Sequence, residues 1–425
     1  AEASKEELSQ LLSSRAECAE LLRENLSAAN DWAAAVRSAA EAAKLWETSL
    51  SLELDAQSGS THAAEADVET LCAVGGACMA FGTLALSRDN GELDAKLRRA
   101  AQAAVKRALD AFEEAVTLCD SARGDDLADV LQRWARALWG AADVVPSAKR
   151  IGLLKLAIEK AAASMRFSLV PLPETACLLG DLLIELGEST WRQRVETDDA
   201  REEAAAAALW LHRRALHEGY AAATRVSQHD LSTLCALADA LLDSARLQHD
   251  MAARGVDVAA QAAAQPSVTA DATQQSPPPL VQPQEEEGVV DVTDAAAAAG
   301  EPGADEEDEL ADAVDAMQVE PPLVPQVIET PTLPPLPLAT ACLERATGVY
   351  SDVLGRPAAE WAASSVSRND AAYNASCAWA LRAEEAECAK LLGVLAAEGA
   401  LTRRELESDA DLASLVPTAW MQELL

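Results

Sequence analysis

Residues 373–400 read YNASCAWALRAEEAECAKLLGVLAAEGA, and this stretch decides the fold class. Small residues recur in it at Cys377, Ala389 and Ala396, within segments rich in Ala and Leu. Ala and Leu cost least in a helix, and small side chains allow two helices to approach each other closely. The stretch therefore predicts a pair of helices packed against each other.

Similar helical segments precede it along the chain. Apolar residues alternate at steps of four and three in residues 97–119, 131–145 and 151–165, which places one apolar stripe on each segment. Pro146 and Ser147 form a stop signal and an N-cap candidate between the last two. Helices joined by such short turns lie antiparallel, so these two segments predict a helical hairpin.

Residues 173–225 predict another hairpin, with PETACLLGDLLIELGE as its first helix and EEAAAAALWLHRRALHEGY as its second. Periodicity indicates about twelve helices in the whole chain and no strand-like alternation. One hairpin cannot bury its own apolar face, so repeated hairpins predict a stacked array.

The stretch 373–400 resembles a repeat of the tetratricopeptide-repeat (TPR) superfamily, with Tyr373 at the opening aromatic position. The following ELESDADLASL resembles the acidic tail that closes many such arrays. Ser376 and Gly393 depart from the pattern, where the family has Leu and a bulky residue. The resemblance is clearest over residues 371–415.

A second, partial match lies in residues 174–188. Leu179, Gly180, Leu183 and Gly187 occupy the family's Leu, Gly, aromatic and Gly positions, while residues 191–201 resemble an insertion between the two helices. The layout alone is also similar to the fungal enhancer-of-translation-termination family, which pairs TPR-like helices with an acidic internal segment.

The composition changes abruptly after Gly255. Residues 256–337 hold 13 of the 18 prolines and 17 acidic residues, with no Lys or Arg. Such a segment buries too little apolar surface to offset its chain entropy. We therefore expect an all-α protein, a TPR-like α-solenoid of antiparallel hairpins, interrupted by a long acidic disordered insert. The expected parts are residues 1–255, the insert 256–337, and helices in 338–425 that pack on the array.

The charge balance bears on function. With 34 Lys and Arg against 70 Asp and Glu, the net charge is −36, and only 4% of residues are aromatic. Nucleic-acid binding depends on basic and aromatic side chains, so we expect no direct nucleic-acid partner. Nine cysteines without a CxxC pair suggest neither a disulfide framework nor a zinc knuckle and indicate a reducing cytoplasmic or nuclear location.

The first ten residues lack the basic and apolar regions of a secretory signal. Residues 70–87 carry no charge and form the one candidate membrane span. Gly75, Gly76 and Gly82 lower its hydrophobicity, and a buried helix packed closely on its neighbours explains them better. We expect no membrane partner.

No catalytic constellation is visible in the sequence. The motifs GxSxG, GxGxxG, GxxxxGK[ST] and HExxH are absent, and His212 and His217 lie about 140° apart around a helix. Acidic pairs are too frequent for their spacing to indicate a carboxylate site. We expect no cofactor, no metal, no small-molecule substrate and no enzymatic activity.

Three candidates for binding a partner are visible in the sequence, and two of them lie in the expected helical parts. Lys96, Arg99 and Lys106 form a basic strip that suits an acidic peptide or a C-terminal carboxylate, with a solvated helix face as the alternative. Chaperone-binding TPR domains hold peptides with a clamp of Lys, Asn and Arg. Asn374 fits one place in that clamp, but the accompanying lysines are not found.

The third candidate lies in the insert. Leu310, Val314 and Met317 follow each other at steps of four and three after an acidic start, which suits a short amphipathic helix in a partner's groove or in the protein's own groove. A plain solvated linker is the alternative.

The sequence thus favours a non-enzymatic adaptor whose solenoid groove binds a peptide or helix of a protein partner, with the insert as a second or autoinhibitory contact. The acidic charge of the insert suits a basic partner. Two alternatives stay open. One is a nuclear regulator of translation termination or gene expression with a TPR-like fold, and the other is a helical enzyme with a dispersed site.

Overall fold

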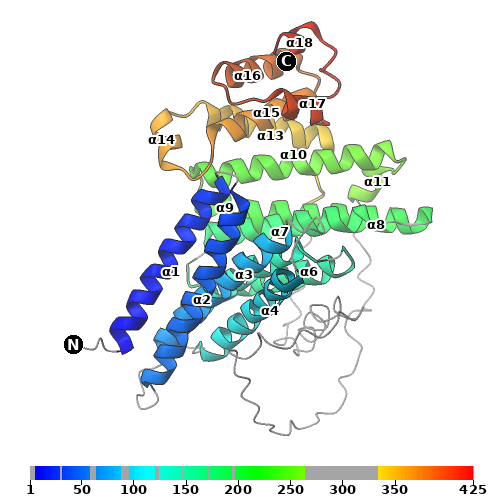
Figure 1. The fold of residues 1–425 in the computed structure, drawn as a ribbon. Helices are drawn as coiled ribbons and strands as arrows, with labels where there is room; N and C mark the ends of the chain where they lie inside the picture. The colour runs from blue at the N-terminus through cyan, green and yellow to red at the C-terminus, as the bar shows by residue number, and fades with distance from the viewer. Residues whose placement is uncertain are drawn as a thin grey trace. The chain divides into compact units, whose positions relative to one another are not determined.

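The computed structural model describes residues 5–28, 31–57, 64–87, 95–119, 124–145, 147–170, 172–193, 197–263 and 334–424. Every regular element in these ranges is a helix, and no strand occurs in them. The chain divides into two units, residues 1–265 with 322–425, and residues 266–321. All helices below belong to the first unit (Figure 1).

Four long helices form the N-terminal part, and each contacts the next along the chain. They are α1 (Lys5–Ala28), α2 (Trp32–Gln57), α3 (Ala64–Ser87) and α4 (Ala95–Leu118). Hydrogen bonds to one carboxylate link the first three helices. Ser9 of α1 donates to Glu53 of α2 at 2.7 Å, and Thr70 of α3 donates to the other oxygen of that carboxylate at 2.8 Å. Buried alanines and leucines fill the remaining contacts.

Helix α3 contains the uncharged stretch of the sequence. Residues Val68–Ser87 are long and apolar enough to cross a membrane, yet 61% of that span is buried by the surrounding protein. A Cβ atom on Gly82 would lie 2.4 Å from Val105 and 2.8 Å from the carbonyl oxygen of Ala101, and one on Gly75 would lie 2.7 Å from the Phe112 ring. Both glycines therefore permit the close approach of α3 and α4 that their small size predicted.

The next helices continue the pairing. They are α5 (Gly124–Ala142), α6 (Ser147–Phe167), α7 (Pro173–Arg192), α8 (Asp198–Arg214), the π-helix η1 (Ala215–Tyr220) and α9 (Ala221–Val226). Helix α5 contacts α6, α6 contacts α7, and α7 contacts α8, η1 and α9. Pro173 begins α7, and the Thr197 hydroxyl caps α8 by accepting from the amide of Ala200 at 3.3 Å.

The remaining helices are α10 (Leu231–Ala253), α11 (Val258–Ala263), α13 (Ala339–Leu354), α14 (Ala358–Ala363), α15 (Arg368–Leu381), α16 (Glu385–Ala397), α17 (Arg403–Ser408) and α18 (Ala419–Leu424). Helix α10 contacts α7, α13 and α15, and α15 contacts α13 and α16. Leu231, Cys235, Val353, Trp361 and Ala371 form one apolar cluster among these elements. Helices on both sides of residues 264–333 thus share a core.

The structure refines two expectations. Within the described residues, twelve helices have 13 or more residues, and six segments have six residues; η1 and α9 lie almost wholly within the hairpin expected over residues 173–225 and were not recognised as separate segments. Fewer than two turns carry too little periodicity to be recognised. The insertion expected over residues 191–201 is shorter, because α7 runs to Arg192 and buries Trp191, and α8 begins at Asp198.

Two parts of the expected disordered insert lie within the described residues. Helix α11 and residues 334–337 fall inside 256–337 but are described, and they pack: Ala262 and Leu336 are buried, and Gln248 donates to the carbonyl of Pro337 at 3.0 Å. Val256 and Ala262 are buried and supply apolar contacts. The composition of the whole segment is an average, and it conceals these local apolar residues.

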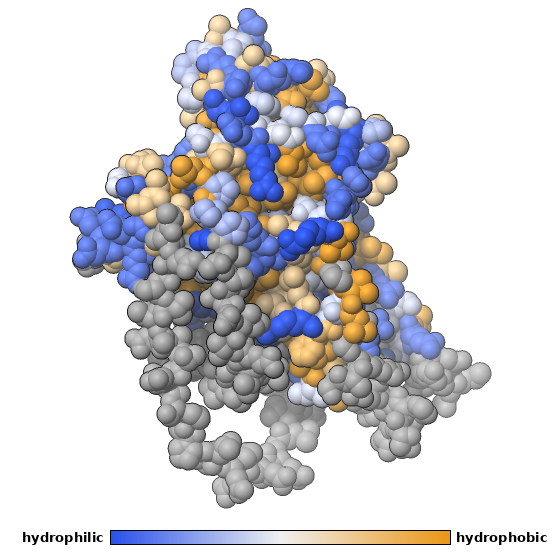
Figure 2. Space-filling view, turned by 180° about the vertical axis from the view of Figure 1, so that it is seen from behind, coloured by the Kyte–Doolittle hydropathy of each residue, from blue (hydrophilic) through white to orange (hydrophobic). Residues whose placement is uncertain are grey.

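The surface is not uniformly polar. Figure 2 shows apolar side chains gathered in the middle of the face turned away from the viewer of Figure 1. Large exposed apolar side chains include Leu11 and Leu21 of α1, and Leu169 and Val170 in the turn before α7.

Candidate functional site

Carboxylates line the neighbouring faces of α7 and α10. Both helices carry charged residues at steps of four and three, and the second set follows the first after 58 residues: Asp181, Glu185 and Glu188 on α7, and Asp239, Asp243 and Arg246 on α10. These steps place each set on one side of its helix. The two helices contact each other, and we call their five carboxylates the acidic face.

Two of these carboxylates accept hydrogen bonds from tyrosines on the helical segment that pairs with their own helix. Tyr220 in η1 donates its hydroxyl proton to Asp181, and Tyr350 in α13 donates to Asp239. Asn374 in α15 also donates to Asp239, at 2.9 Å. The same tyrosine and aspartate contact therefore recurs in two successive helix pairs.

Asp181 and Asp239 have no ion pair with any described residue. Burial raises the pKa of Asp181 to about 6, the hydrogen bond from Tyr220 opposes this, and the nearby charges of Asp239 and Asp243 add to it. Burial likewise raises the pKa of Asp239, against the hydrogen bonds from Tyr350 and Asn374. Only neutral groups donate hydrogen bonds to the two carboxylates, and the charges of Arg136 and Arg246 lower the pKa of Asp181 and of Asp239, respectively, without forming an ion pair with them.

The other members of the acidic face are paired. Arg150 donates to Glu185 at 2.5 Å, Arg192 donates to Glu188 at 2.5 Å, and Arg246 donates to Asp243 at 2.9 Å. The side chain of Arg192 is 67% exposed, so its pair with Glu188 is open to solvent. Burial still raises the pKa of Glu188, with Arg192 opposing.

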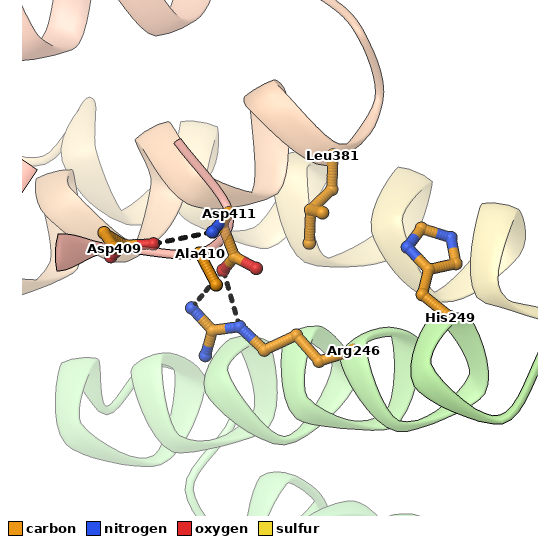
Figure 3. A pocket seen from close by; sticks show the side chains of 6 residues that line it. All are labelled: Arg246, His249, Leu381, Asp409, Ala410 and Asp411. Carbon is orange, nitrogen blue, oxygen red and sulfur yellow. Dashed lines mark hydrogen bonds and ion pairs between the residues drawn. The ribbon is translucent and has the colours of Figure 1, made fainter. Parts of the chain in front are cut away.

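Arg246 also holds the C-terminal part of the chain. Its guanidinium donates to Asp411 from Nε at 2.7 Å and pairs with the same carboxylate through Nη2 at 2.6 Å. Burial opposes the charge of Arg246, but Asp411 and Asp243 outweigh burial and raise the pKa of the guanidinium. Figure 3 shows Arg246 reaching from α10 to Asp411.

A pocket of about 460 Å³ opens beside this ion pair (Figure 3). Its lining residues are Arg246, His249, Leu381, Asp409, Ala410 and Asp411. They come from the end of α10, the end of α15 and the turn after α17. The pocket thus combines one apolar wall with charged groups.

Three potential metal ligands lie next to the pocket. Ligand atoms of Cys377, Asp409 and Asp411 are all within 4.8 Å of one another. Asp409 already accepts from the Tyr373 hydroxyl at 2.8 Å, from the Cys377 thiol at 3.6 Å and from the amide of Asp411 at 2.8 Å.

Burial raises the pKa of the Cys377 thiol, so the thiolate form that binds metals is disfavoured. The partners in place explain this cluster as a clasp for the C-terminal turn. We call Arg246, Tyr373, Cys377, Asp409 and Asp411 the C-terminal clasp.

The structure places the predicted binding residues apart from one another. Lys96, Arg99 and Lys106 lie exposed on α4, which contacts α3 and α5. Asn374 lies on α15 and donates to the acidic face, where it is half-buried. Leu310, Val314 and Met317 lie outside the described residues.

The two histidines of interest differ in environment. His212 is fully buried, its Nδ1 lies 3.0 Å from the Ser244 hydroxyl, and burial lowers its pKa to about 3. His212 therefore lies in the core and not at a solvated surface, because Gly187 leaves room for its ring against α7. His217 is partly exposed in η1.

The acidic face was not predicted from the sequence. The sequence did contain a signal, because α7 and α10 match each other at an offset of 58 residues. The offset holds for the charged residues and also for small and apolar ones: Leu179, Gly180, Leu183 and Gly187 correspond to Leu237, Ala238, Leu241 and Ala245. Acidic spacing considered within one helix carries little information, whereas the same spacing in two matched helices is informative.

Compared with models of known protein families, with curated proteins and with solved structures, the chain gives no significant match.

Proposed function

We propose that the chain is a non-enzymatic adaptor, a TPR-like α-solenoid that binds a basic segment of a partner protein along the acidic face of α7 and α10. The observation that carries the proposal is the pair of half-buried carboxylates, Asp181 and Asp239, which lie at matching positions of two neighbouring helices and form no ion pair with a described residue. Lysine or arginine side chains of a partner form ion pairs with them.

The energetics support a basic occupant. Burial and mutual repulsion raise the carboxyl pKa of Asp181, which means that its ionised form is unfavourable in the unbound chain. A cation placed nearby relieves that cost, and it does so more effectively than at a fully solvated carboxylate because the surroundings are partly dehydrated.

The helix pairing supports a TPR-like array. Consecutive long helices contact each other along the first unit, and Gly180 permits the close crossing that the repeat pattern requires, since a Cβ there would lie 2.6 Å from the Tyr220 ring. Solenoid helices of this kind commonly present one face to partners. We assign the segment 256–337 a role from its acidic composition: it is a second contact for a basic partner, or it competes with the partner's binding site.

Binding of a fluorescent peptide rich in lysine and arginine to the full chain tests the proposal. The variant carries both Asp181→Asn and Asp239→Asn, which keep an oxygen acceptor for the tyrosines and remove two charges. We expect its affinity to fall about tenfold, with a weaker dependence on salt.

The matched control carries Glu113→Gln and Glu203→Gln, two exposed acids on α4 and α8. We expect its affinity to stay within about twofold of the wild type, since distant exposed charges are screened. Equal losses in both variants would show that the peptide responds only to net charge, and the proposal would then be wrong.

A salt-graded pull-down with mass spectrometry extends the test to natural partners. Partners that are lost in the double Asp variant but kept by a chain lacking residues 256–337 would bind at the helical face. Partners lost only on deletion of 256–337 would bind that segment.

A further inference from the structure

Three arginines act electrostatically on His217. They lie on helices other than α7 and α10, which carry the acidic face. They are Arg213 at the end of α8, Arg225 in α9 and Arg345 in α13, and we call them the arginine cluster. Burial lowers the pKa of His217, and the charges of Arg213, Arg345 and Arg225 lower it further, while Glu218 opposes them. Segment η1, which carries His217, contacts α8, α9 and α10, and α10 contacts α13, so the three arginines come from elements that pack together.

Arg213 is the buried member of the cluster. Its residue is 4% exposed, and its Nε is buried with no hydrogen-bond partner among the described residues. The guanidinium lies over the Trp210 ring, 5.3 Å from the ring centroid. A buried guanidinium nitrogen without an acceptor is costly, so a ligand oxygen that accepts from this side chain would stabilise it.

The acids near the cluster do not neutralise it. Glu218 is held by Arg214, which donates to it from Nε at 3.0 and 3.1 Å and from Nη2 at 2.7 Å. Within the part of the chain that the structure describes, the arginine cluster forms no ion pair. This stands out in a chain whose net charge is −36 and whose other buried or half-buried arginines are mostly paired.

The helical backbone places Trp210, Arg213 and His217 on the same side of α8 and η1. Trp210, Arg213 and His217 follow each other at steps of three and four, and the π-helix η1 begins between the last two. A π-helix is a rare element that is found frequently at functional sites. Arg225 and Arg345 are exposed, so the cluster joins a buried charge to two charges at the surface.

We propose that the arginine cluster binds an acidic peptide segment of a partner protein, with carboxylates of that segment paired to Arg213, Arg225 and Arg345. The planar guanidinium fork matches a carboxylate in a bidentate manner. The three guanidiniums come from three separate helices, and carboxylates spaced along a peptide reach such separate positions. The Trp210 ring supports the buried guanidinium from one side.

The strongly negative chain does not prevent this binding. At physiological salt the Debye length is about 8 Å, so distant acids contribute little and the local charges decide. The site uses other helices and the opposite charge from the acidic face, and its test is independent of the proposed function.

Fluorescence anisotropy of a labelled oligoglutamate peptide, titrated with the full chain, tests the proposal. The variant carries Arg225→Glu and Arg345→Glu, both at exposed positions whose replacement leaves the core intact. We expect binding by the wild type that weakens with salt, and an affinity at least about tenfold lower in the variant.

The matched control carries Arg368→Glu and Arg404→Glu, which make the same charge change at two exposed arginines of α15 and α17. Its affinity is expected to stay within about twofold of the wild type. An equal loss in the control, or no binding of oligoglutamate by the wild type, would overturn the proposal. If inorganic phosphate binds in a way that depends on Arg225 and Arg345 while oligoglutamate does not, the site is one for small oxyanions and the peptide assignment is wrong.

Discussion

At the residue scale, the pKa values of buried groups set how stability responds to pH. Asp181 has its pKa raised to about 6 from an ordinary 3.8, and His212 has its pKa lowered to about 3 from an ordinary 6.5. Between the ordinary pKa of 3.8 and the raised pKa of about 6, the folded chain keeps a proton on Asp181 that the unfolded chain has released. The unfolded chain meanwhile holds a proton on His212 that the folded chain does not bind. The two residues therefore change the free energy of unfolding in opposite directions.

The sign of each effect follows from proton linkage. Asp181 makes the free energy of unfolding fall as the pH rises from about 4 to 6, because the folded state holds more protons there. His212 makes it rise over the same window, because the unfolded state holds more protons. Their contributions partly cancel in the wild type.

The variant Asp181→Asn separates the two effects. It removes an unfavourable buried charge and keeps an oxygen acceptor for Tyr220, so we expect a gain of about 1–2 kcal/mol in the free energy of unfolding at neutral pH. Without Asp181, stability should rise more steeply with pH between about 4 and 6 than in the wild type. Urea unfolding across that range measures both effects.

The exposed substitution Asp199→Asn on α8 is the control, with an expected change within about 0.5 kcal/mol. A loss of stability at neutral pH in Asp181→Asn would show that the carboxylate is favourable where it lies, against the raised pKa.

At the scale of the elements, glycines decide how closely paired helices approach. A Cβ on Gly219 would lie 2.6 Å from the Cα of Gly180, so η1 and α7 cross with their backbones nearly in contact. Gly82 plays the same part between α3 and α4, where the nearest atoms belong to Val105 and to the Ala101 carbonyl. Backbone atoms cannot move aside as side chains can, so these positions tolerate no larger residue.

Helix α3 offers a matched pair of substitutions. Gly82→Ala should lower the free energy of unfolding by about 1–3 kcal/mol, because its methyl group meets the Ala101 carbonyl. Gly76→Ala on the same helix should leave stability unchanged or raise it by up to about 1 kcal/mol, because no atom lies within 4 Å of the new Cβ. Thermal unfolding followed by circular dichroism compares them, and equal effects would contradict the close packing of α3 on α4.

At the scale of the whole first unit, the C-terminal clasp joins segments that are distant in sequence. Arg246 and Asp411 are 165 residues apart, and the Asp411 side chain is only 13% exposed. Tyr373 and Cys377 of α15 hold Asp409 in the same turn. The acidic turn that resembles the end of a TPR array thus has a defined physical role here: it fixes the last helices to α10 and α15.

Arg246→Met should open this clasp. The substitution leaves Asp411 partly buried without its cation, so we expect a loss of about 2 kcal/mol in stability. Hydrogen exchange should rise selectively in residues 403–424. Arg133→Met, which breaks an exposed pair with Asp129 on α5, should cost less than about 0.5 kcal/mol and leave exchange in 403–424 unchanged. Unchanged protection of 403–424 in Arg246→Met would mean that apolar contacts alone, such as those of Leu412 and Leu415, hold the turn.

The sequence predicted the helices and their small-residue contacts well, but it did not single out the acidic face or the arginine cluster. Periodicity within one long helix is a local property, so α7 begins at Pro173 as expected and α6 begins at Ser147, the N-cap candidate, whereas α5 begins seven residues before the expected segment 131–145. Asn374 was singled out by family resemblance, and its bond to Asp239 places it at the acidic face. Asp181 and Arg213 carried no local signal, because acids and arginines on a helix are ordinarily solvated.

By itself, the sequence determined an all-helical protein in which apolar stripes and small residues specify where helices pack, because these features act over three or four residues along one helix. Only the tertiary structure decided which charges meet. The neighbouring carboxylates of α7 and α10, the clasp between Arg246 and Asp411 and the arginine cluster each bring together residues of separate helices. Electrostatic energy depends on separation in space and on burial, and neither quantity follows from spacing along the sequence.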